Sequence, residues 1–194
     1  MTRIALTAAL IAGLPLAATA APVQWSTADG GNGHYYELIT TKKTFADASA
    51  AAQASTHAGL SGHIVTITSA EEQAFLDDLN TSQMEAWIGA SDTDEEGVFA
   101  WITGPEAGTV FYTTTDGTQT YANWNPGEPN DWGSGEDYVE GWFGGAKDWN
   151  DIKASNKNAY IVEYSVVAPI PLPAALPLML LGLGALGYAR KRKG

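Results

Sequence analysis

The sequence contains no cysteine, which excludes thiol catalysis, thiolate metal sites and a disulfide scaffold. Basic residues are also scarce, since 10 Lys and Arg stand against 22 Asp and Glu, a formal net charge of -12. Because phosphate backbones are bound by basic faces, we expect no nucleic-acid partner. The three histidines, His34, His57 and His63, show no close pairing, so a zinc centre is not expected.

The 194 residues, 45% of them apolar, suffice for one globular domain with a core but not for two. Seven tryptophans are a high content for a chain of this length. Aromatic-rich acidic surfaces often contact sugars, cations or partner proteins, so the composition favours a binding protein.

The N-terminal end has the pattern of a secretory signal peptide. Arg3 precedes an apolar run, and Ala18-Thr19-Ala20 is a small-residue cleavage site, so residues 1–20 are predicted to be removed. The alternative is a retained anchor helix, but Pro15 and the short apolar run argue against it.

The C-terminal end predicts a transmembrane helix. Residues 170–189 carry no charge and would form a helix about 30 Å long, which matches a bilayer core. The basic run Arg190 to Lys193 follows directly and belongs on the cytoplasmic side. We therefore divide the chain into a signal peptide (1–20), a domain (21–168) and a C-terminal sorting segment (169–194).

Without its two ends the domain is strongly acidic. The two ends contain five arginines and lysines but no Asp or Glu, so their removal takes away positive charge only. The five remaining lysines stand against 22 acidic residues, a formal charge of -17. An exported domain of this charge favours divalent-cation binding.

Hydrophobic patterning along the domain predicts an α+β arrangement. A helix is expected over 44–56 with Thr44 as its N-cap, and a second helix after Ser69, with Phe75, Leu76 and Leu79 on its apolar face. Strands are expected at 34–40, 63–68, 86–91, 99–102, 138–139 and 160–164. Between them, residues 92–151 are rich in Gly, Pro, Asn and Asp, and a loop region this long is usually functional.

Side-chain oxygens concentrate in this loop region. Calcium takes six to eight oxygen ligands from carboxylates, amides and carbonyls. Five residues can supply such oxygens, and three of them are charged: Glu128, Asn130, Glu136, Asn150 and Asp151.

Four separated motifs resemble those of the C-type lectin domain and occur in that family's order. They are Trp87-Ile88-Gly89, the loop 128–137, Trp149-Asn150-Asp151 and the strand 160–164. The resemblance covers 34–164 and implies a double-loop α+β fold, with two helices flanking small antiparallel sheets. It also implies that the five oxygen-bearing residues bind Ca2+, that the Glu128-Pro129 bond is cis, and that the protein is not an enzyme.

In this family the bound calcium also coordinates sugar hydroxyls. Each hydroxyl donates to a carboxylate and accepts from an amide NH2. The Glu-Pro-Asn order at 128–130 implies mannose, glucose, N-acetylglucosamine or fucose as ligand. Trp132, in contrast, stands where galactose binders often place a stacking tryptophan, so the preference stays mixed. Trp132 and Trp142 are the tryptophans expected to contact ligand.

A second ion is implied at Asp92, Glu96 and Asp131, with Glu136 shared. An EF-hand at this acidic loop is excluded, because Thr103 occupies the twelfth position where a Glu is needed. The alternative is a merely solvated acidic loop.

The family's usual cysteines are absent, with Tyr138, Ala154 and Val162 at their positions, so stability should depend more on the core and on calcium.

The C-terminal segment resembles the VPLPA-type PEP-CTERM signals of Gram-negative bacteria. Residues 170–177 read IPLPAALP, with Ile170 in place of Val, before an apolar run and a basic tail. This implies recognition by an exosortase-type membrane enzyme after transient anchoring. A plain membrane anchor is the alternative, and both place the domain outside the cytoplasm, secreted or at the cell surface.

Two other functions compete with sugar binding. A glycosidase could use Glu128 and Glu136 as its pair of carboxylates, but a shared calcium would keep both ionised and leave no general acid. A lectin-fold module that binds proteins or another non-sugar surface is the second alternative. The loop residues could also be ordinary turn formers.

Overall fold

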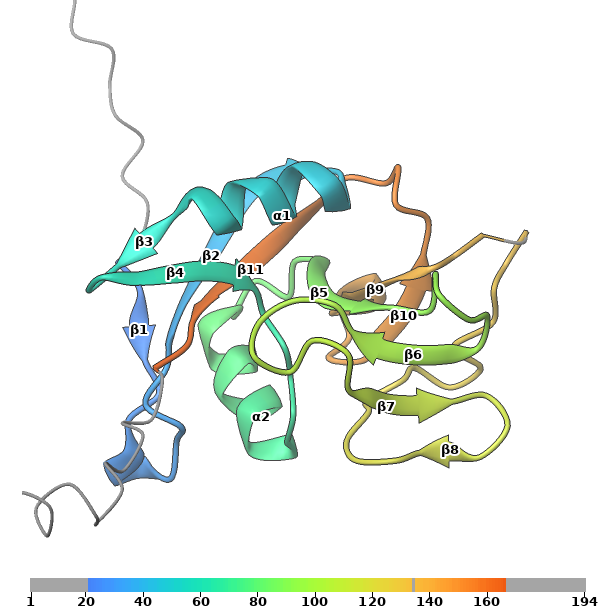
Figure 1. The fold of residues 1–194 in the computed structure, drawn as a ribbon, viewed down its shortest axis with the longest axis horizontal. Helices are drawn as coiled ribbons and strands as arrows, with labels where there is room; N and C mark the ends of the chain where they lie inside the picture. The colour runs from blue at the N-terminus through green and yellow to red at the C-terminus, as the bar shows by residue number, and fades with distance from the viewer. Residues whose placement is uncertain (1–20, 134, 167–194) are drawn as a thin grey trace, which may run out of the picture.

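The computed structural model describes residues 21–133 and 135–166, in which a pair of long strands joins the two ends of the domain (Figure 1). β2 (Tyr35–Lys43) and β11 (Asn158–Tyr164) are antiparallel, with Tyr35 opposite Tyr164. β1 (Val23–Gln24) adds to the outer side of β2 and is followed by the short 3-10 helix η1 (Thr27–Asp29). The first and last described residues therefore lie at the same side of the molecule.

The two predicted helices are present, and both begin at a side-chain cap. In α1 (Phe45–Ala54) the Thr44 hydroxyl accepts the amide of Asp47 at 3.3 Å. In α2 (Ala70–Leu79) the Ser69 hydroxyl accepts the amide of Glu72 at 3.1 Å. Such caps satisfy amides that the first helical turn leaves without partners. In Figure 1, α1 lies above and α2 below the strands β2 and β11.

The remaining strands extend the sheet toward the loop region. The path runs β1-β2-β11-β5-β6-β7-β8, and β5 meets β11 in parallel while its other neighbours are antiparallel. β9 pairs with both β5 and β10. These strands are β3 (Thr56–His57), β4 (Leu60–Ile64), β5 (Ala86–Ser91), β6 (Val98–Trp101), β7 (Val110–Thr113), β8 (Gly117–Thr118), β9 (Tyr138–Gly141) and β10 (Trp149–Ile152).

Large aromatic side chains fill the core, and the ring N–H groups of two fully buried tryptophans are hydrogen-bonded. Trp87 and Trp149 are fully buried. The Trp87 ring N–H donates to the carbonyl of Lys43, and that of Trp149 donates to Gln73 Oε1, each at 2.8 Å. Burying one large apolar side chain contributes about 1.5–3 kcal/mol. Val162, at one of the missing cysteine positions, is buried in the same apolar cluster as Ala52, so packing takes the place of a cross-link there.

The predicted elements are largely found, with shifted boundaries. The strand over 86–91 is confirmed residue for residue, whereas the strand expected at 63–68 covers 60–64 instead. β10 lies where the sequence predicts loop, and β7 is not predicted at all. Among the described residues no helix is long and apolar enough to cross a membrane, and the predicted signal peptide and C-terminal helix lie outside those residues.

Candidate functional site

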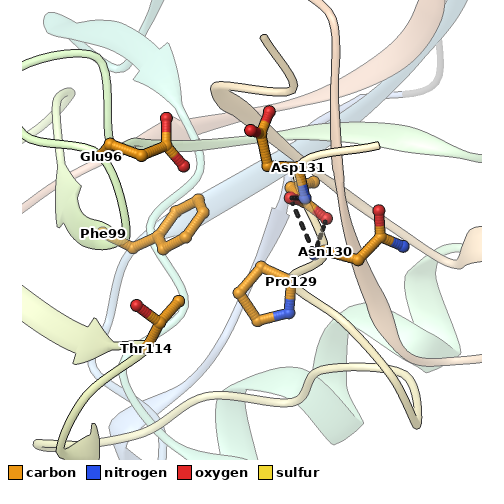
Figure 2. Close-up of a pocket in the computed structure, with 7 residues that line it drawn as sticks. Glu96, Phe99, Thr114, Pro129, Asn130 and Asp131 are labelled. Atoms are coloured by element: carbon orange, nitrogen blue, oxygen red, sulfur yellow. Dashed lines mark hydrogen bonds between the residues drawn. The ribbon is translucent and has the colours of Figure 1, made fainter. Parts of the chain in front are cut away.

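Asp151 on β10 connects the long loop to the sheet. Its carboxylate is buried and accepts the backbone amide of Asn130 at 3.0 Å on each oxygen, and the amide of Asp131 at 2.7 Å. The dashed lines in Figure 2 mark the bonds to Asn130. β10 is held in register by β9, where Asp151 faces Val139. A strand therefore fixes the position of the carboxylate on which the loop closes.

The segment Glu128-Pro129-Asn130 presents a carboxylate and an amide side by side. The peptide bond before Pro129 is cis, as the resemblance implies. The Asn130 side-chain amide donates to Glu128 Oε2 at 2.5 Å. The two side chains are therefore neighbours, as ligands of one ion must be.

The next residues form a tight turn held by two acids. Asp131 has a φ of 45°, a left-handed conformation that Asp tolerates better than most residues. Its Oδ1 accepts the amides of Gly135 at 2.5 Å and Glu136 at 3.2 Å. Glu136 in turn accepts the amide of Trp132 at 2.9 Å. This turn brings Glu136 to the side of the loop where Asp151 lies. The negative charge of Asp151 adds to the effect of burial and raises the pKa of both Glu128 and Glu136.

Asn150 is buried and lies opposite Glu140 on β9. Its side-chain amide donates to Glu140 Oε1 at 3.1 Å, and the amide of Asn158 on β11 donates to the other oxygen, Oε2. The sequence analysis identifies Asn150 but not Glu140 or Asn158. Glu140 lies within β9 and Asn158 is the first residue of β11, and neither belongs to a motif that the sequence analysis uses.

The acidic loop after β5 contributes Asp92, whose side chain is 3% exposed. Its Oδ2 accepts the amide of Gly97 at 2.9 Å, whereas Oδ1 is buried without a hydrogen-bond partner in the described structure. Nearby is a cavity of about 180 Å3, which Figure 2 shows with the carboxylates of Glu96 and Asp131 on one side. Its lining residues are Glu96, Phe99, Thr114, Pro129, Asn130, Asp131 and Asp151.

The acids of the loop region lie close enough to repel one another. Burial, together with the neighbouring Asp151 and Glu136, raises the pKa of Glu128 to about 7. Burial also raises the pKa of Glu136 and of Asp92, and the proximity of Asp92 raises the pKa of Glu96. A cation placed among these groups would relieve that repulsion.

The donor set fits calcium in its chemistry. Within residues 21–133 and 135–166, no group of three or more acidic or histidine side chains stands in position to hold a metal ion. Two of the five predicted ligands are amides, and the carboxylates of Asp151 and Glu136 accept backbone amides. The orphaned Oδ1 of Asp92 is the feature that a cation would satisfy.

The two tryptophans expected to contact ligand behave differently. Trp132 is 76% exposed beside the loop acids, so its ring is free to meet a ligand. The expectation for Trp142 is wrong, because its side chain is fully buried and its ring N–H donates to Asp77 at 2.9 Å. Trp142 stabilises the core against α2 instead.

Comparison with known proteins agrees with this geometry. The model of the Lectin C-type domain matches residues 41–164, and that of the PEP-CTERM protein-sorting motif matches residues 169–193. Halomucin from Haloquadratum walsbyi is 41% identical over 138 residues, which are 69% of this chain and 1% of that protein. The mouse low affinity immunoglobulin epsilon Fc receptor is 37% identical over 117 residues, 60% of this chain and 31% of the receptor. The chain thus spans less than a third of either relative.

A solved structure shares the fold. The cow C-type carbohydrate-recognition domain of CD23, determined in the presence of a GlcNAc2Man3 oligosaccharide, aligns with a TM-score of 0.53 and 29% identity. The alignment covers 70% of this chain and 90% of that domain. With the family model spanning most of the α+β domain and the sorting motif following it, the chain belongs to the C-type lectin domain family and carries a C-terminal PEP-CTERM motif.

Proposed function

We propose that this protein is an exported, calcium-dependent carbohydrate-binding protein. The observation that carries the proposal is that Asp151 holds the backbone of Asn130 and Asp131, which gathers the Glu-Pro-Asn segment against β10. The related CD23 domain is named for carbohydrate recognition, which supports a binding protein rather than an enzyme.

The residues that would hold the sugar-binding ion are Glu128, Asn130, Glu136, Asn150 and Asp151. The ion would offer open coordination positions to two neighbouring sugar hydroxyls. Glu128 and Glu136 would accept hydrogen bonds from those hydroxyls, and the amide NH2 groups of Asn130 and Asn150 would donate to them. An amide NH2 has two hydrogens, so Asn150 can bind Glu140 and a sugar at once.

A second ion would lie at Asp92, Glu96 and Asp131, with Glu136 shared. The unpartnered Oδ1 of Asp92 supports this proposal, because a buried carboxylate oxygen without a donor is costly unless a cation meets it.

For the sugar preference, the Glu-Pro-Asn order supports mannose-, glucose- or fucose-type hydroxyl pairs over galactose. Trp132, being exposed, offers its ring face to a sugar in either case.

For the cellular location, the sorting motif supports export. We propose that residues 1–20 direct secretion and that an exosortase-type enzyme processes the segment 169–194 at the membrane.

Affinity resins test the proposal. The domain, passed over mannose and galactose resins with calcium, should be retained by mannose and released by chelator. Retention that survives chelator would favour a non-sugar adhesion module, and turnover of a chromogenic glycoside would favour a glycosidase.

The variant Asn150→Ala should lose calcium-dependent retention, because it removes an ion ligand and a donor to the sugar together. Asn156→Ala, at an amide in the turn before β11, is the matched control and should bind as the unaltered domain does. Retention of the Asn150 variant in calcium would contradict the assignment.

A further inference from the structure

Glu140 is a buried carboxylate that the proposed sugar contacts do not use. It is 1% exposed, and no described Lys, Arg or His forms an ion pair with it. Removing a carboxylate from water is costly unless hydrogen bonds replace the lost hydration. Here the replacement comes from two amides, those of Asn150 on one strand and Asn158 on another.

The contact fixes which way the Asn150 amide faces. Both oxygens of Glu140 accept from an amide NH2, so Asn150 turns its NH2 toward Glu140 and its oxygen away. Within the described chain no group donates to Asn150 Oδ1, which is therefore left free. Asn150 and Glu140 are direct partners across β10 and β9, so the strands fix the backbone and Glu140 fixes the amide.

We propose that Glu140 is a positioning residue for the ion site, which orients Asn150 so that Oδ1 faces the ion and the second N–H faces the sugar. The inference rests on the proposed function. Asn158 completes the arrangement by occupying the other oxygen of Glu140, which holds the carboxylate in one rotamer between β10 and β11.

Glu is the side chain of this length that accepts from both amides. A Gln at position 140 would have one oxygen and one NH2, so one of the two asparagines would face it donor to donor. A Met at the same position would keep the bulk and provide no acceptor at all. Both substitutions remove the carboxylate, but Gln keeps one acceptor oxygen beside a donor NH2, whereas Met keeps neither.

Calcium titration calorimetry of the whole folded domain tests the proposal. E140M should weaken calcium binding by about 10- to 100-fold, the range found when a ligand's supporting partner is removed. E140Q should fall between E140M and the unaltered domain. The double variant E140Q/N158D should bind calcium more tightly than E140M and lose less than about tenfold relative to the unaltered domain. In that variant the new carboxylate at position 158 accepts from the Gln NH2, so the Gln oxygen turns back to accept from Asn150.

A purely structural role would lower the calcium-free melting temperature without this order of affinities, so melting is measured on each variant. If E140M does not fold, the double variant decides alone. Unchanged calcium affinity in E140M would overturn the positioning role. So would a double variant that binds calcium as weakly as E140M, or about tenfold or more below the unaltered domain. An unaltered domain that binds no calcium would overturn the proposed function itself, and the two failures are therefore distinct.

Discussion

Glu128 combines partial burial with close acidic neighbours, and these two features raise its pKa to about 7. Calcium binds the carboxylate form, so binding must displace any proton held there. In the proposed site this residue would make calcium affinity depend on pH near neutrality, where carboxylates of ordinary pKa would not.

We expect calcium affinity to fall below pH 7, by up to about tenfold per pH unit for each proton displaced.

Stability of the calcium-free domain should change in the opposite sense. Glu140, like Glu128, has a pKa raised to about 7 by burial, so the folded chain binds more protons than the unfolded chain between about pH 4.5 and 7. Stability without calcium should therefore decrease as pH rises through this window, and thermal melting at about pH 5.5 and 8 in chelator checks it. A higher melting temperature at the upper pH would contradict it.

The proposed sugar preference can also be tested at single residues. Exchanging the order of donor and acceptor, with Glu128→Gln and Asn130→Asp together, should move retention from mannose toward galactose resin. Trp132→Ala in the same background should reduce the gained galactose retention by about 2- to 12-fold, since a stacked ring contributes about 0.5–1.5 kcal/mol. If the exchange leaves the preference unchanged, the walls around the site set it instead.

Among the loop elements, the segment 92–97 contains Asp92, whose buried carboxylate oxygen Oδ1 has no hydrogen-bond donor. Asp92→Asn removes the buried charge while an oxygen remains for the amide of Gly97. We expect this variant to melt at the same or a higher temperature than the unaltered domain in chelator, and to gain less from added calcium. Asp94→Asn, on the exposed side of the same loop, is the control and should change neither. A full calcium response in Asp92→Asn would argue against an ion there.

Elements governed by local pattern were predictable from the sequence. Thr44 and Ser69 mark both helix starts, and the apolar run at 86–91 marks β5. β10 was not predictable, because Trp149-Asn150-Asp151 looks like a polar turn, and it becomes a strand only through pairing with β9. The five oxygen donors were recognisable through the family resemblance, whereas Glu140 and Asn158 emerge only when three strands are brought together.

As a whole, the domain carries a formal charge of -17 and no cross-link. Self-repulsion of this size destabilises the compact state, and bound calcium would offset it. Chelator should lower the melting temperature by roughly 10 °C relative to a solution at about 100 times the calcium Kd, a stabilisation of about 2.7 kcal/mol. An identical melting curve with and without chelator would count against calcium as a structural ligand, and magnesium at the same ionic strength is the control.

A single site of this kind should also bind one sugar weakly, near millimolar, or about -4 kcal/mol. Useful retention then depends on many copies displayed together or on a polymeric glycan.

The pairing of β1 with β2 and of β2 with β11 has a consequence for such display. It places residues 23 and 164 at one side of the sheet, while β6, β7 and β8 and the loop after them extend toward the opposite side in Figure 1. A copy tethered through its C-terminal end would hold that end against the envelope and turn the long loop toward the medium. Neighbouring copies on one cell could then engage a shared polymer without any change of shape.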